Sequence, residues 1–213
     1  MRHFEFAIEA LLIMGMSSSV LLIALVALSL LQAVSAQQGS EGFLAACLSS
    51  DPEEVESALQ DLKHGADINA RDGHTGQTCL MASTLRGNID MVMTMLEHGA
   101  DATVAEKDGY TPPHGAGFQG RPEVMRVLKE VGGIDVVNSP HADGFFPIHR
   151  ACWGRERRHA ETVDYLLSIG EDPNRRSTGD RKQTCLEMTR NPHTIEVLKK
   201  YGVTAESSGR DDL

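Results

Sequence analysis

Four short segments of similar composition recur along this chain of 213 residues, and their regular spacing limits its fold more than any other feature. They are TCLMAST (78–84), TPPHGAG (111–117), FPIHRAC (146–152) and TCLEMTR (184–190), and their starts lie 33, 35 and 38 residues apart. Self-similarity at a period of roughly 20–50 residues is the signature of repeat architectures, in which each unit buries its apolar face only against its neighbours.

A second set of segments alternates with the first: HGADIN (64–69), HGADAT (98–103), VGGIDV (131–136), IGEDPN (169–174) and YGV (201–203). Between the two sets, apolar residues recur with helical spacing, as in Met91–Leu96. Thr111 followed by Pro112 is typical of a helix start. Four glycines are predicted to take the left-handed conformation that ends a second helix: Gly65, Gly99, Gly132 and Gly170.

This combination resembles the ankyrin repeat, whose units read T-P-L-H-x-A-A, then a helical stretch, then G-A-D-x-N. The resemblance covers about residues 41–203 and implies an all-α solenoid of about five helix-turn-helix units with finger loops between them. A polar tail, residues 204–213, follows. The first unit lacks T-P-L-H and the fifth is short, as capping units are. The units are placed at about 41–70, 78–103, 111–138, 146–174 and 184–203.

Residues 1–36 have the layout of a signal segment. A cationic start at Arg2 precedes an apolar stretch that begins at Leu11, and small side chains lead to an expected cleavage site after Ala36. The alternative is an uncleaved anchor, because residues 11–31 are long enough to cross a bilayer as a helix. We therefore expect a protein that is secreted or resides in the lumen of the endoplasmic reticulum, with a membrane-anchored protein as the alternative.

The last four residues, RDDL, match two of the four positions of the K-D-E-L retrieval signal. Such a signal would keep the protein in the lumen.

Composition argues against several kinds of function. The net charge of −10 disfavours binding to the phosphate backbone of nucleic acids. The G-x-G-x-x-G match at 115–120 lacks the preceding strand that dinucleotide binding requires. The nine histidines form no H-E-x-x-H motif and the cysteines no C-x-x-C pair, and the resemblance gives His114 and His149 a bonding role between repeats. We expect no catalytic residue, no metal and no cofactor.

The four cysteines occupy equivalent positions in pairs. Cys47 and Cys152 fall near the end of the first helix of units 1 and 4, and Cys79 and Cys185 follow the opening Thr of units 2 and 5. Neighbouring first helices stack closely, so each pair is expected at a distance that a disulfide can bridge. The alternative is that each Cys serves only as a small buried side chain. We predict the bonds Cys47–Cys79 and Cys152–Cys185, which an oxidising compartment would favour.

In ankyrin proteins a partner usually lies against the concave face, formed by the finger loops and first helices. Four of the chain's ten aromatic residues fall on this face in units 3 and 4, and clustered aromatic residues favour binding hot spots. A basic group between Arg150 and Lys182 is interrupted by acidic residues and is interpreted as a solvated loop surface. Carried over by position, the candidate partner-binding residues are Leu85, Arg86, Lys107, Tyr110, Phe118, Phe145 and Trp153.

The sequence therefore indicates a non-catalytic protein–protein interaction module of the secretory pathway, monomeric, with a protein partner whose identity no motif encodes. The alternative is a membrane-tethered ankyrin scaffold that keeps residues 11–31 as its anchor.

The cysteine pairing has a direct test. Native protein that is denatured without reductant and then alkylated should show no free thiol by mass spectrometry, because all four sulfurs are expected in disulfides. Four alkylated thiols would contradict the pairing.

Overall fold

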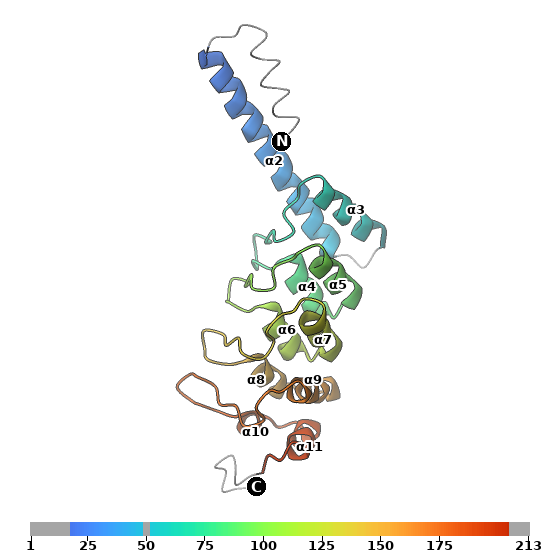
Figure 1. Cartoon of the computed structure of the whole chain (residues 1–213), viewed down its shortest axis with the longest axis vertical. Coiled ribbons are helices and arrows are strands. Elements are labelled where there is room, and N and C mark those ends of the chain that lie inside the picture. The colour runs from blue at the N-terminus through green and yellow to red at the C-terminus, as the bar shows by residue number, and fades with distance from the viewer. Residues whose placement is uncertain (1–17, 49–51, 205–213) are drawn as a thin grey trace.

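The computed structural model describes residues 18–48 and 52–204, and these residues form helices, turns and loops without a strand (Figure 1). The all-α repeat solenoid expected from the sequence is confirmed. Its helical hairpins stack along the long axis of the molecule, and loops project to one side between them. The hairpins are α2 (Ser18–Leu48) with α3 (Pro52–Lys63), α4 (Cys79–Arg86) with α5 (Ile89–Glu97), α6 (Pro112–Gln119) with α7 (Pro122–Glu130), α8 (Pro147–Cys152) with α9 (Arg157–Ser168), and α10 (Cys185–Met188) with α11 (Pro192–Lys200).

Side-chain caps explain where the first helices begin. The hydroxyl of Thr78 accepts a hydrogen bond from the backbone N–H of Met81 at the start of α4. At the start of α10, the backbone N–H of Thr184 donates to the Glu187 carboxylate at 2.8 Å, and the Thr184 hydroxyl accepts from the Glu187 N–H. These bonds satisfy N–H groups that the first turn of a helix leaves without an intrahelical partner.

Left-handed glycines end the second helices, with one departure from the prediction. Gly65, Gly99 and Gly170 have positive φ as expected. In the third unit the positive φ of 64° belongs to Gly133, so the assignment to Gly132 was wrong. The turn after α7 contains one additional residue, and the left-handed position moves one residue along the chain.

The core runs the length of the stack. Phe43, Leu80, Met125, Ile148 and Leu198, which come from five successive units, are each no more than 1% exposed. Because α4 has only 8 residues and α5 only 9, neither would be stable alone in water. Packing against adjacent units therefore supplies most of the stability of each hairpin.

Consecutive first helices approach so closely that one contact leaves no room for a side chain. A Cβ atom built on Gly117 of α6 would lie 2.4 Å from the carbonyl oxygen of Pro147 in α8. Ala116, the residue before it, is fully buried. The small residues that recur in the sequence are thus a steric requirement of the stacking.

The cysteines lie at the equivalent contact near the two ends of the stack. The structure brings Cys47 to Cys79 and Cys152 to Cys185, the two expected pairs, each with a Cα–Cα distance of 5.5 Å, within the range for disulfides. All four are buried. One pair joins units 1 and 2 and the other joins units 4 and 5, whereas Gly117 occupies the corresponding place between units 3 and 4.

Side chains at the start of the second helices, or just before it, also contact the chain at or just after the end of the first helix of the preceding unit. In each case a side-chain nitrogen lies 3.2 Å from a backbone carbonyl oxygen, and this contact recurs in three successive units of the stack. The pairs are Arg121 Nη2 with Leu85, His159 Nε2 with Phe118, and Asn191 Nδ2 with Gly154.

Helix α2 combines two segments that the sequence separates. Its last turns carry buried Phe43 and Cys47 as the first helix of unit 1, and its N-terminal part projects from the stack with exposed residues such as Ile23 and Leu30 (Figure 1). The helix runs without a break through Ala36, where cleavage is predicted, and residues 1–17 of the predicted signal segment lie outside the described residues. Within the described chain, no helix combines the length and apolar character needed to cross a membrane.

Substitutions at two glycines of α6 should separate steric stacking from helix propensity. Gly117→Ala should lower the free energy of unfolding by about 1–3 kcal/mol, because its Cβ would collide with the backbone of α8. Gly115→Ala is the matched control, since its Cβ would meet only the flexible ends of Leu85 and Met81 and alanine favours the helix by about 0.5–1 kcal/mol. Urea unfolding of both variants measures the difference, and equal stability would contradict the steric account.

Candidate protein-interaction site

The first helices α4, α6 and α8, together with the loops that precede them, form one surface, which we call the finger face. A cavity of about 290 Å³ opens on it between units 2, 3 and 4. Phe118 and Trp153, 55% and 42% exposed, both line this cavity, and Gly115 contributes no side chain to it. Other residues that contribute to the lining are Gln77, Met81, Leu85, Glu106 and Tyr110.

Four of the seven residues predicted to bind a partner line this cavity: Leu85, Tyr110, Phe118 and Trp153. Phe145 does not line the cavity but is half-buried beside it, with its ring edge-on to Trp153 at 5.2 Å between centroids. The structure therefore gathers the predicted aromatic cluster around a single cavity.

Arg86 and Lys107 lie elsewhere. Arg86 lines an adjacent cavity of about 240 Å³ between units 1 and 2, which shares Gln77 with the first. The ammonium group of Lys107 donates hydrogen bonds to the carbonyl oxygens of Gly73 and His74 at 2.7 and 2.6 Å. This side chain joins two finger loops, which is a structural role that the sequence did not reveal.

Arg150 was missed as a site residue. The sequence placed it with the solvated loop arginines, yet only 2% of it is exposed, and it contributes to the lining of the cavity. Its guanidinium carbon lies 4.8 Å from the ring centroid of Tyr110, 5.4 Å from Phe145 and 4.6 Å from Trp153, and its Nη2 donates to Asp143 Oδ2 at 2.6 Å. A buried cation is stabilised by such aromatic faces and by a carboxylate partner.

One signal in the sequence could have identified this arginine. In the repeat alignment Arg150 takes the position of Ala82 and Gly115, where the neighbouring units carry small residues. A long cation at a position that faces the adjacent first helix needs a partner within the fold.

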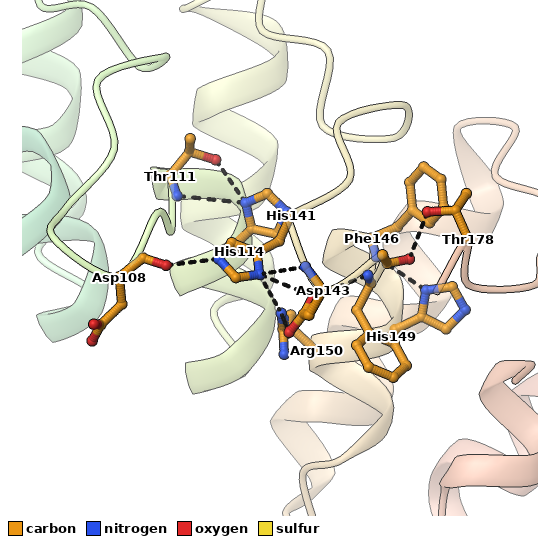
Figure 2. A network of polar contacts seen from close by, with 11 residues as sticks. Asp108, Thr111, His114, His141, Asp143, Phe146, His149, Arg150 and Thr178 are labelled. Carbon is orange, nitrogen blue, oxygen red and sulfur yellow. Dashed lines mark hydrogen bonds and ion pairs between the residues drawn. The ribbon is translucent and has the colours of Figure 1, made fainter. Parts of the chain in front are cut away.

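His141 connects this arginine to the neighbouring loop (Figure 2). Its ring stacks on Tyr110, with centroids 4.2 Å apart and planes 9° apart. Its Nε2 donates to the carbonyl oxygen of Asp108 at 2.7 Å, and its Nδ1 lies 2.9 Å from Asp143 Oδ1 and 3.2 Å from Arg150 Nη2. The loop residues of units 3 and 4 are thereby held in one polar network.

The electrostatics of the network favour a charged Asp143. Partial burial would raise the pKa of this carboxyl group, but hydrogen bonds from Arg150 and from the Phe145 N–H outweigh that effect and lower the pKa to about 2. Asp143 is therefore ionised at neutral pH, and it balances the charge of Arg150.

The T-P-L-H histidines have structural positions. His114 contacts the Thr111 hydroxyl, and His149 accepts a hydrogen bond from the Phe146 N–H (Figure 2). His149 also contacts the Arg175 carbonyl oxygen at 3.1 Å. Burial lowers the pKa of each ring to about 4, so both are neutral at pH 7. In the part of the chain that the structure describes, no three His, Cys, Asp or Glu residues are grouped to hold a metal ion.

A stack of helical hairpins with loops projecting between them is the architecture of helical repeat proteins. Comparison with known families identifies the repeat. A model of three ankyrin repeats matches residues 43–140, and a single ankyrin repeat matches residues 143–178. The chain belongs to the ankyrin-repeat family.

Individual relatives share this repeat in different contexts. The Notch-regulated ankyrin repeat-containing protein of Homo sapiens is 31% identical over 99 residues, 46% of this chain and 86% of that protein. Tyrosine-protein kinase HTK16 of Hydra vulgaris is 30% identical over 159 residues, 74% of this chain but 20% of the kinase. NAD-dependent deacetylase sir2B of Dictyostelium discoideum is 36% identical over 126 residues, 59% of this chain and 16% of the deacetylase. This chain therefore spans only a small part of both enzymes.

The Asp143 pKa gives a prediction about pH. Asp143→Asn should destabilise the protein at neutral pH by about 1–3 kcal/mol, because it removes the charged partner of Arg150, which is only 2% exposed, while the 38% exposure of Asp143 itself limits the loss. Its folded pKa of about 2 lies below its ordinary value of 3.8, so the wild type should lose this advantage as the pH falls from about 4 toward about 2.

Urea midpoints measured from about pH 6 to about pH 3 test this sign. A difference between wild type and variant that stays constant down to the lowest pH would contradict the ion pair.

Proposed function

We propose that this chain is a non-catalytic protein-binding module that holds a protein partner on its finger face, the concave face of the array. The binding site is centred on the cavity lined by Phe118 and Trp153. The observation that carries the proposal is the exposure of these two large aromatic side chains at one cavity of the finger face. Aromatic residues dominate binding hot spots because they bury a large area with little loss of conformational freedom.

The underlying structure favours binding with little rearrangement. Arg150 and His141 hold Tyr110 and the loop of unit 4 in fixed positions before any partner arrives. A preorganised surface loses less conformational entropy on association. Among the described residues, the histidines and carboxylates of the network are engaged in hydrogen bonds of the fold, which supports a binding role over catalysis.

We further propose that the module acts in the secretory pathway. The layout of residues 1–36 and the two buried cysteine pairs support this location, because disulfides persist in oxidising compartments. The second candidate is a membrane-tethered scaffold anchored by residues 11–31, which the exposed apolar side chains of α2 favour.

Partner capture tests the binding face. Tagged protein expressed in its native host should recover the same partners for wild type and for Val131→Ala, which removes a 46% exposed apolar side chain outside the cavity. Phe118→Ala and Trp153→Ala should each weaken recovery by tenfold or more, roughly the effect of losing a hot spot, and Phe118→Ala should change the melting temperature little. Unchanged recovery for both variants would contradict the proposed face.

Fractionation tests the location. A carbonate wash should release the protein from membranes in a shortened form, because cleavage after Ala36 removes the apolar segment. A full-length band that resists carbonate would contradict cleavage and support the tethered scaffold.

A further inference from the structure

The cavity between units 2, 3 and 4 also indicates what kind of side chain it would receive. Its volume of about 290 Å³ is near the lower limit of small-molecule sites, so it suits one large side chain of a partner better than an extended ligand. Leu85, Phe118 and Trp153 give it apolar walls. The inserted group is therefore large and apolar.

The deep part of the cavity already contains a cation. The Arg150 guanidinium lies against Tyr110, Phe145 and Trp153, and these rings are the groups that would otherwise attract a positive ligand. A lysine or arginine inserted here would meet a like charge in a poorly solvated site. Any lysine or arginine side chain of the partner must therefore lie outside this cavity.

The rim of the cavity has the opposite charge. Glu106 is half-buried in the loop before α6, and its Oε2 accepts a hydrogen bond from Gln77 Nε2 at 2.7 Å. Among the described residues it forms no ion pair, and the neighbouring Lys107 is bound to carbonyl groups of another loop. The carboxylate is therefore available to a basic group beside an inserted side chain.

We infer that the partner segment inserts one large apolar side chain between Phe118 and Trp153 and carries an adjacent lysine or arginine that pairs with Glu106. This inference rests on the proposed function and specifies the chemistry of its partner. The net charge of −10 on the chain adds long-range attraction for such a basic segment.

Selection of short random peptides displayed on phage, with the full chain as target at low ionic strength, tests the inference. Selected peptides should contain a large apolar residue next to Lys or Arg. Their affinity should fall about tenfold for Phe118→Ala, and about threefold to tenfold for Glu106→Gln, which keeps an acceptor for Gln77 but removes the charge. The matched control Glu97→Gln, at an exposed carboxylate ending α5, should leave the affinity unchanged.

The outcomes separate this inference from the proposed function. Peptides that require Phe118 but are neutral or acidic, or that bind Glu106→Gln as well as wild type, would overturn the inference and leave the binding face intact. Peptides that bind Phe118→Ala as tightly as wild type would overturn the inference. Partner capture in the native host that is unchanged by both Phe118→Ala and Trp153→Ala would overturn the proposed function. Thermal unfolding of each variant confirms that it is folded.

Discussion

The structure depends on the close contact between the first helices of successive units. None of the hairpins α4–α5, α6–α7 or α8–α9 is long enough to bury an apolar face by itself, so each exists because its neighbours cover it. The contact tolerates little variation, since at Gly117 even a methyl group would meet the Pro147 carbonyl. Caps, turns and loops determine where each helix begins and ends, but this stacking is what makes the helices stable.

The finger-face cavity follows from the same contact. Ala82, Gly115 and Arg150 occupy equivalent positions in units 2, 3 and 4. Glycine at the middle position leaves a space open to the surface, and arginine at the next position contributes to its lining while remaining buried. The step from Gly115 to Arg150, at equivalent positions of units 3 and 4, thus creates a cavity with a positive charge in its wall in an otherwise regular array.

Local chemistry made much of the fold predictable from the sequence. The start of α6 could be recognised from Thr111 and Pro112, because a capping threonine and a proline in the first turn are adjacent in the sequence. The cysteine pairs could be proposed because the repeat makes their positions equivalent. Gly133 was missed because two adjacent glycines compete for one left-handed position. The environment of Arg150 was missed for a different reason: Tyr110 contacts it from the loop of another unit, and local periodicity contains no information on that contact.

The positions of the two cysteine pairs change where the array is expected to open. In a repeat stack without cross-links, terminal units have one neighbour instead of two, so they fray first and exchange their amide hydrogens fastest. Here the predicted bonds Cys47–Cys79 and Cys152–Cys185 would tie those terminal units to the interior. The junctions without a covalent tie lie between units 2, 3 and 4, on both sides of the cavity. Transient opening is therefore expected at the central junctions that flank the cavity, more than at the ends of the molecule.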